Sequence, residues 1–428
     1  MAIELAPLRC ATAGSVDDGK STLIGRLLLD SKALLSDQVA HVAEVSRRRG
    51  LERTDLALVT DGLRAEREQG ITIDVAWRYF ATPRRRFVLA DAPGHVQYTR
   101  NMVTACSLAD VATILLDVRR GVTEQTRRHV FLTRLLGVRS LVFTVNKMDE
   151  VGFAHDAFAR LRDEITRYLE AFKSTRRDVE VFFVPISALA GDNVVEPSRK
   201  MPWYDGPTLL ALLEGLPVDR ASAVGPARMP VQWVIRTPSG ASGSYRGYAG
   251  RVTAGTLRVG QTLRCLPAGG ETCIQRIDTS EGETSEARAG QSVVLYLTDE
   301  LDVSRGDMLV GADDAPPWVT QDLVAEVAWV SSATARVGAS YIVKHTTREA
   351  RAILDGIEAR YDITSGAEEP PGDTAFGLNT LGRVRLRTSS PLAIDSYRDF
   401  RATGSFLLID PTSSETLAAG LVDRAIAP

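Results

Sequence analysis

Residues 14–21 read G-S-V-D-D-G-K-S, and this segment constrains the fold of the chain more than any other. It follows a short apolar run at residues 9–13 and precedes an amphipathic helical pattern at residues 21–29. The pattern G-x-x-x-x-G-K-[ST] requires this strand–loop–helix setting, because its glycines let successive backbone N–H groups converge on phosphate oxygens. The start of the helix adds the positive end of its dipole. We therefore expect a phosphate-binding loop in which Lys20 contacts the outer phosphates and the Ser21 hydroxyl binds Mg²⁺.

Two further motifs follow in the order that a guanine-nucleotide switch requires, D-A-P-G-H at residues 91–95 and N-K-M-D at residues 146–149. Asp91 ends an apolar strand, where its carboxylate can reach Mg²⁺ through water. Gly94 lets a backbone N–H approach the γ-phosphate, so loss of that phosphate would let the loop relax. The carboxylate of Asp149 can accept hydrogen bonds from N1–H and the 2-amino group of guanine, which adenine lacks. The motifs together predict a switch that hydrolyses GTP.

Two residues outside the phosphate loop are the candidates for catalysis. His95 directly follows the predicted metal and γ-phosphate contacts, where it can orient the attacking water. Thr72, in G-I-T-I, can complete the Mg²⁺ shell when the γ-phosphate holds its loop closed, although alone it would be a strand-initiating threonine. With Lys20, these residues form the predicted catalytic set, and the predicted metal ligands are Ser21, Thr72 and Asp91. The predicted GTP-binding residues are Gly14, Ser15, Val16, Asp17, Asp18, Gly19, Lys20, Ser21, Asp91, Ala92, Pro93, Gly94, His95, Asn146, Lys147, Met148, Asp149, Ser187, Ala188 and Leu189.

The distribution of apolar runs predicts a multidomain chain. In the first half, apolar strands alternate with amphipathic helices, which indicates an α/β domain with a mostly parallel sheet covered on both faces. After Pro230, short β-branched runs separated by Gly, Asp and Pro indicate antiparallel barrels. We expect a GTP-binding domain at residues 1–220, a linker at 218–229, and β-barrels at 228–312 and 320–428. The pattern at residues 346–364 mixes strand and helix formers and predicts no single element.

The composition indicates in which compartment the chain is expected and which classes of partner it is not expected to bind. The formal net charge of −3, from 51 basic and 54 acidic residues, argues against a broad nucleic-acid or membrane surface. The four cysteines have no C-x-x-C spacing, and no apolar leader is present at residues 1–13, so we expect reduced thiols in a cytoplasmic protein. Cys265 and Cys273 could face each other across a hairpin, but small buried apolar residues are the expected default. The paired arginines 119–120 and 127–128 are expected on solvated or ion-paired faces, with docking of a partner as the alternative.

With these motifs placed, the chain resembles translation-factor-type GTPases, which have a GTPase domain followed by two β-barrels. In that class the water-orienting histidine of D-x-P-G-H corresponds to His95 and the effector-loop threonine to Thr72. The resemblance is closest to the GTPase large subunits of bacterial sulfate adenylyltransferases. It is carried by G-S-V-D-D-G-K-S-T-L-I-G-R-L-L at 14–28, D-G-L-R-A-E-R-E-Q-G-I-T-I-D-V-A at 61–76, R-R-G-V-x-x-Q-T-R-R-H at 119–129, W-Y-D-G-P-T-L-L at 203–210, Y-R-G-Y-A-G at 245–250 and T-D-E-x-D-x-S-R-G-D at 298–307.

This resemblance implies a heteromeric enzyme, either a heterodimer or a higher assembly. A separate small subunit would bind ATP and join it to sulfate, giving adenylylsulfate and diphosphate. The present chain would bind GTP with Mg²⁺ and hydrolyse it to drive that unfavourable step. The alternative hypothesis is an elongation-factor-like GTPase that delivers aminoacyl-tRNA, and a third is a stand-alone regulatory GTPase. The first hypothesis implies no nucleic-acid or membrane partner.

Overall fold

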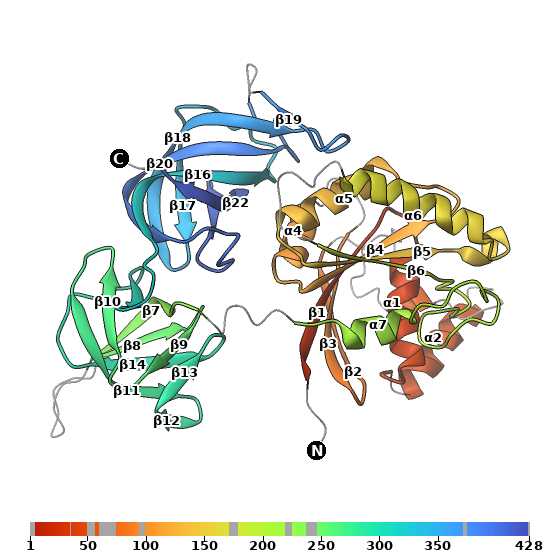
Figure 1. Cartoon of the computed structure of the whole chain (residues 1–428), viewed down its shortest axis with the longest axis horizontal. Helices are drawn as coiled ribbons and strands as arrows, with labels where there is room; N and C mark the ends of the chain where they lie inside the picture. The colour runs from red at the N-terminus through yellow and green to blue at the C-terminus, as the bar shows by residue number, and fades with distance from the viewer. Residues whose placement is uncertain are drawn as a thin grey trace. The chain divides into compact units, whose positions relative to one another are not determined.

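The computed structural model describes residues 5–34, 36–48, 56–59, 74–93, 99–170, 179–218, 225–236, 246–370 and 375–426. The chain divides into two compact units (Figure 1). One comprises Met1–Val218 together with Asp362–Ala367, and the other comprises Asp219–Tyr361 together with Glu368–Pro428.

The first unit is built on a six-stranded sheet with the order β2-β3-β1-β4-β5-β6. The β2–β3 pair is antiparallel and the other pairs are parallel. This confirms the predicted α/β domain with a mostly parallel sheet. Its strands are β1 (Leu5–Ala13), β2 (Ala76–Ala81), β3 (Arg85–Asp91), β4 (Val111–Asp117), β5 (Ser140–Asn146) and β6 (Glu180–Pro185). Its helices are α1 (Lys20–Asp30), α2 (Ser36–Arg48), η1 (Leu56–Val59), α4 (Thr99–Ser107), α5 (Glu124–Leu135), η3 (Met148–Val151), α6 (His155–Glu170) and α7 (Leu209–Gly215).

The sequence explains why this sheet is buried. Every residue of β4 (V-A-T-I-L-L-D) and of β5 (S-L-V-F-T-V-N) is buried, as expected for central parallel strands covered on both faces. Figure 1 shows α1 and α7 on one side of the sheet and α4, α5 and α6 on the other. Leu23, Ile24 and Leu27 of α1 share a core with Leu209 and Leu213 of α7. The sheet therefore presents the carboxyl ends of its parallel strands at one edge, where loops gather in folds of this class.

The second unit begins with a closed antiparallel barrel. Its strands follow the order β10-β15-β7-β8-β14-β11, and pairing of β10 with β11 closes the ring. The strands are β7 (Arg228–Arg236), β8 (Arg246–Arg251), β10 (Thr262–Leu266), β11 (Glu271–Thr279), β14 (Ser292–Leu297) and β15 (Met308–Gly311), with shorter β9 (Thr256–Arg258), β12 (Gly282–Thr284) and β13 (Glu286–Arg288). Closure leaves no free sheet edge in the ring.

A second closed antiparallel barrel follows. Its ring has the order β17-β21-β22-β16-β20-β18 and is closed by pairing of β17 with β18. The strands are β16 (Trp318–Trp329), β17 (Ser340–His345), β18 (Arg348–Tyr361), β20 (Leu381–Ile394), β21 (Ser405–Ile409) and β22 (Thr416–Ala425), with β19 (Glu368–Glu369) beside β18. Two barrels after the α/β domain confirm the predicted fold class. The domain limits at 1–220, 228–312 and 320–428 stay predictions.

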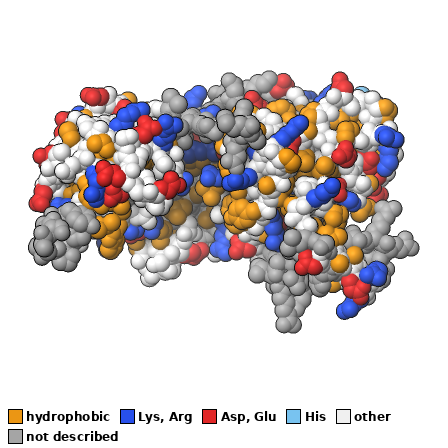
Figure 2. All heavy atoms as spheres, turned by 90° about the horizontal axis from the view of Figure 1, so that it is seen from below, with side chains coloured by type: hydrophobic (Ala, Val, Ile, Leu, Met, Phe, Trp, Pro, Cys, Tyr) orange, Lys and Arg blue, Asp and Glu red, His pale blue; other side chains and the backbone are white. Residues whose placement is uncertain are grey.

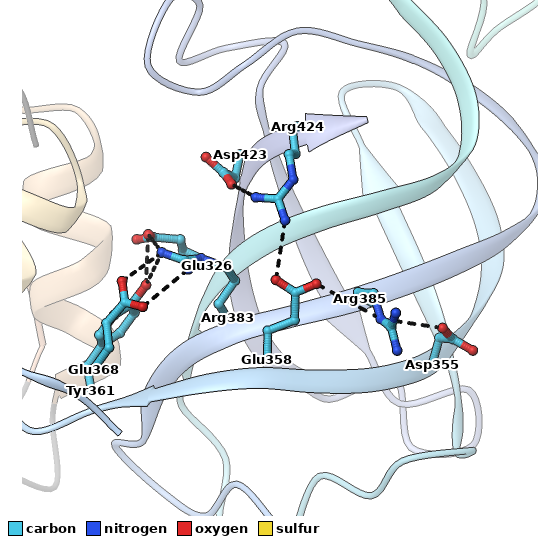
Figure 3. A network of polar contacts seen from close by, with 9 residues as sticks. All are labelled: Glu326, Asp355, Glu358, Tyr361, Glu368, Arg383, Arg385, Asp423 and Arg424. Carbon is cyan, nitrogen blue, oxygen red and sulfur yellow. Dashed lines mark hydrogen bonds and ion pairs between the residues drawn. The ribbon is translucent and has the colours of Figure 1, made fainter. Parts of the chain in front are cut away.

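The outer face of this barrel carries a network of charges that crosses several strands (Figure 3). Arg383 on β20 contacts Glu368 at 2.9 Å and donates to the Tyr361 hydroxyl at 3.0 Å. Two strand positions away, Arg385 lies 3.6 Å from Asp355 on β18. Alternate residues of a strand face the same side, so β20 presents its arginines outward while Val384 and Leu386 enter the core.

The two barrels are joined by a buried ion pair. The guanidinium of Arg228 on β7 donates from Nε and Nη2 to the two carboxylate oxygens of Asp395, each at 3.2 Å. Both side chains are buried, and the Thr403 hydroxyl also donates to Asp395 at 2.6 Å. Leu266, Met308 and Val310 of the first barrel pack with Ala393 beside the ion pair. This interface fixes the barrels within one unit.

One local prediction, the end of the linker, is wrong. Arg228 and Met229 belong to β7 rather than to the predicted linker, because their backbone pairs with Val310 and Leu309 of β15. As expected, all four cysteines are free thiols and Cys265 is buried; the alternative in which Cys265 faces Cys273 is not realised, since Cys273 pairs with Thr262. Among the described residues, no helix is long and apolar enough to cross a membrane. On the face that Figure 2 shows, basic and acidic side chains are interspersed, as the nearly balanced composition suggests.

Candidate functional site

The predicted phosphate loop connects β1 to α1 at the carboxyl edge of the sheet (Figure 1). Gly19, directly before the helix, has a φ of 95°, in the left-handed region that favours glycine. A Cβ added at Gly19 would lie 2.5 Å from Nδ2 of Asn146. Both the turn and the close approach of Asn146 therefore require glycine at this position.

The ammonium group of Lys20 lies over the phosphate loop. Its Nζ donates to the carbonyl oxygens of Gly14 at 2.8 Å and Ser15 at 3.0 Å. Burial lowers the pKa of Lys20, and the nearby carboxylates of Asp91, Asp18 and Asp17 oppose that change. With two of its three N–H groups on backbone carbonyls, the side chain is held where the third can meet a phosphate oxygen.

The side chain of Asp18 stabilises the phosphate loop by a hydrogen bond within the loop. Its Oδ2 accepts a hydrogen bond of 2.6 Å from the Ser15 N–H, and the residue is only 2% exposed. Burial raises the pKa of Asp18, whereas the hydrogen bond from Ser15 and the charges of Lys20 and Arg120 lower it. The turn at 15–18 is thus closed by one of its own side chains.

Asn146 ties three loops together. Its Nδ2 donates to the Asp18 carbonyl at 2.7 Å, and its Oδ1 accepts from the Ala188 N–H at 2.9 Å. The next residue, Lys147, donates from Nζ to the Asp17 carbonyl at 2.6 Å. The structure therefore brings the phosphate loop, the N-K-M-D segment and the loop after β6 to one place. Met148 is fully buried, and Asp149 is partly exposed in η3.

The chemistry of Ser21 and Asp91 fits Mg²⁺, which prefers hard oxygen ligands. Asp91 ends β3 and pairs in register with Thr12 of β1, the strand that leads into the phosphate loop. Its Oδ1 accepts from the Thr12 hydroxyl at 3.1 Å, and the carboxylate is 2% exposed. Ser21 lies in the first turn of α1. Ala92 and Pro93 follow Asp91 and are buried. Thr72, Gly94 and His95 lie outside the described residues.

Sequence reasoning missed a buried carboxylate at this edge. Asp117 ends β4, and its Oδ2 lies 2.9 Å from Nζ of Lys147 and 2.8 Å from Nη2 of Arg119. Arg120 donates to the Val16 carbonyl at 2.7 Å, and the Thr123 hydroxyl lies 2.8 Å from that of Ser15. Arg119 is ion-paired, as the sequence led us to expect, whereas the contact of Arg120 with the phosphate loop was not foreseen. The sequence signal that could have identified Asp117 is its position as an acidic residue at the end of a central parallel strand.

Comparison with known proteins places this site in a family. Residues 7–218 match the family model described as the elongation factor Tu GTP binding domain. Residues 322–423 match a GTP-eEF1A C-terminal domain-like family. A solved structure of sup35 complexed with GDP aligns with 100% of the chain and 96% of its own length, at 23% identity. Its TM-score is 0.44, which is too low to indicate a shared arrangement of domains.

The similarity to curated proteins extends over nearly the whole chain. The chain is 50% identical over 98% of its length to a "Bifunctional enzyme CysN/CysC" of Mycobacterium tuberculosis and covers 67% of that protein. It is 45% identical to a "Sulfate adenylyltransferase subunit 1" of Citrobacter koseri and 46% identical to one of Yersinia pestis, covering 86% of each. These relatives confirm the resemblance seen in the sequence motifs: the chain belongs to the sulfate adenylyltransferase subunit 1 family.

Proposed function

We propose that this chain is the GTP-hydrolysing subunit of a heteromeric sulfate adenylyltransferase. The proposal depends on one combined observation. The chain matches a subunit 1 protein over 98% of its length. In the same chain, Asn146 links the phosphate loop, the N-K-M-D segment and the loop after β6 by hydrogen bonds. The partner small subunit converts ATP and sulfate to adenylylsulfate and diphosphate. This chain converts GTP and water to GDP and phosphate, and the coupling drives the first reaction forward.

The main predicted site residues have the following roles in this proposal. The backbone of residues 14–21 and the Lys20 ammonium bind the phosphates, and Asp149 selects guanine. Ser21, Thr72 and Asp91 hold Mg²⁺, which when bound neutralises charge on the β- and γ-phosphates. His95 orients the attacking water. The buried bonds of Lys20 support its role, because they hold the ammonium in place before the nucleotide binds.

The name "subunit 1" of the relatives indicates a second subunit. We propose that this partner is the ATP-binding small subunit, in a heterodimer or a larger cytoplasmic assembly without nucleic acid or membrane. In this arrangement the two nucleotides occupy different chains. Loss of the GTP site should therefore leave ATP binding by the partner unchanged.

Delivery of aminoacyl-tRNA is not favoured, because the relatives from Citrobacter koseri and Yersinia pestis are named sulfate adenylyltransferase subunit 1. Co-purification separates the hypotheses. The tagged chain, expressed in its native host with GTP and Mg²⁺, should retain a small subunit that binds ATP. Retention of aminoacyl-tRNA instead would support the elongation-factor hypothesis, and retention of neither would support a stand-alone GTPase.

A further inference from the structure

Arg26 lies on α1, six residues after Lys20, and reaches across to the loop that follows β6. Its Nε donates to the Ala188 carbonyl at 3.2 Å, and its Nη2 donates to the Leu189 carbonyl. Its Nη1 lies 3.5 Å from Asp30, one helical turn further along α1. The guanidinium is thus held by its own helix while it binds consecutive carbonyls of another segment.

The Ala188–Leu189 segment is fixed from two sides. The Ala188 N–H donates to Asn146, and the Ala188 carbonyl accepts from Arg26. The turn then passes closely over Arg26 and Asp30 at Gly191, whose φ is +87°. A Cβ added at Gly191 would lie 3.3 Å from Oδ2 of Asp30 and 3.5 Å from Cδ of Arg26.

The planarity of the peptide bond fixes the direction in which the Leu189 N–H points. The carbonyl of Ala188 and the N–H of Leu189 belong to one planar trans peptide, so they point to opposite sides. Because Arg26 holds the carbonyl toward α1, the Leu189 N–H is aimed away from α1. That N–H has no hydrogen-bond partner among the described residues, whereas the Ala190 N–H is bound by the Ser187 hydroxyl oxygen.

We propose that Arg26 is a positioning residue for base recognition, which aims the backbone N–H of Leu189 at the 6-oxygen of guanine. The inference rests on the proposed guanine site. It links the two ends of the nucleotide through one helix: the first turn of α1 serves the phosphates and its second turn fixes the loop that reads the base. Lysine could not replace Arg26 fully, because its single ammonium lacks the planar fork that spans both carbonyls.

The test compares nucleotides that differ at one edge of the base. The full chain, as wild type, Arg26→Met and Arg26→Lys, is titrated with GDP, 6-thio-GDP and IDP. In 6-thio-GDP sulfur replaces the 6-oxygen, whereas IDP lacks the 2-amino group that Asp149 would read. Arg26→Met should reduce the preference for GDP over 6-thio-GDP about fivefold, the effect of one lost hydrogen bond. Its preference for GDP over IDP should not change, and Arg26→Lys should fall between wild type and Arg26→Met.

Arg48→Met is the matched control, because Arg48 is exposed on α2 and pairs with Glu44. It should leave both preferences at wild-type values. If Arg26→Met weakens the binding of all three nucleotides equally, the proposal is overturned. A general structural effect would change each affinity by the same factor and leave both preferences unchanged. Unchanged ratios in both Arg26 variants would overturn it too. A wild type that binds ADP as well as GDP would instead refute the guanine site itself.

Discussion

The Nζ of Lys147 lies 2.9 Å from Oδ2 of Asp117, a carboxylate with no exposed side-chain surface at the end of β4. The same lysine donates to the Asp17 carbonyl in the phosphate loop. Asp117 therefore supports two nucleotide loops through one neighbour. Burial favours a raised pKa for Asp117, but hydrogen bonds from Arg119 and Lys147 outweigh it and hold the pKa well below its usual range.

Replacing Asp117 by Asn should weaken GTP binding about tenfold, because Lys147 loses its charged partner. Isothermal titration at neutral pH measures the effect. Asp156→Asn is the control, since Asp156 is almost fully exposed at the start of α6. Equal GTP affinity of Asp117→Asn and wild type would show that Asp117 does not position Lys147.

The lowered pKa of Asp117 also predicts how stability depends on pH. A carboxyl whose pKa is lower in the folded state contributes stability above its ordinary unfolded pKa of 3.8, and this stability is lost as pH falls through the folded pKa. The difference in unfolding free energy between wild type and Asp117→Asn should thus be constant from neutral pH to about pH 5 and shrink below pH 4. Urea denaturation across this range measures it. A difference that grows on acidification would contradict the assignment.

Base selectivity is expected to depend on Asp149. Asp149→Asn should bind GTP more weakly by about 2–3 kcal/mol, because a charge-assisted pair of hydrogen bonds is lost. The same variant should prefer xanthosine triphosphate, whose altered purine edge suits an amide donor. Competition titrations with both nucleotides test this. Unchanged GTP affinity would mean that the N-K-M-D segment does not read the base.

Hydrolysis is expected to depend on His95. His95→Ala should slow GTP cleavage about a hundredfold while leaving GTP affinity within roughly twofold, because water positioning matters in the transition state. Single-turnover cleavage and equilibrium binding, measured on the same preparation, separate the two effects. Parallel loss of both would indicate that His95 supports the fold rather than the reaction.

The two barrels should depend on the Arg228–Asp395 pair. Asp395→Ala leaves a buried guanidinium without its carboxylate and should destabilise the second unit by about 3–5 kcal/mol. The double variant Arg228→Met/Asp395→Leu should recover most of that loss, because no unpaired charge remains. Arg385→Met, in the exposed network of Figure 3, should cost less than about 1 kcal/mol. Denaturation curves that rank Arg385→Met with Asp395→Ala would contradict this account.

Short, regular patterns allowed the best sequence predictions of the fold. The apolar run at residues 9–13 lies within β1, and the amphipathic helical pattern at residues 21–29 lies within α1. Strand β18 was not predicted: its alternation is broken by register shifts at Leu354/Gly356 and Ile357/Ala359. An irregular strand loses its period of two, and with it the signal that a sequence can show.

The motifs located the nucleotide loops but not the residues that brace them. Asn146 and Lys20 follow recognisable patterns, and the structure places them together with Asp18. Arg26 contacts a carbonyl 162 residues away, and Asp117 acts through a lysine in the next strand's loop. Such roles depend on which loops meet at the sheet edge, so no local spacing predicts them. Thr72 and His95 stay predictions from the motifs alone.

The most direct test of the proposed function measures adenylylsulfate formed by the chain together with its small subunit, from ATP and sulfate at equilibrium. With GTP turning over, the yield should exceed that reached without GTP. A non-hydrolysable GTP analogue, or GTP with Lys20→Ala, should give no excess, while ATP binding by the small subunit is unchanged. The same adenylylsulfate yield with and without GTP turnover would contradict energy coupling.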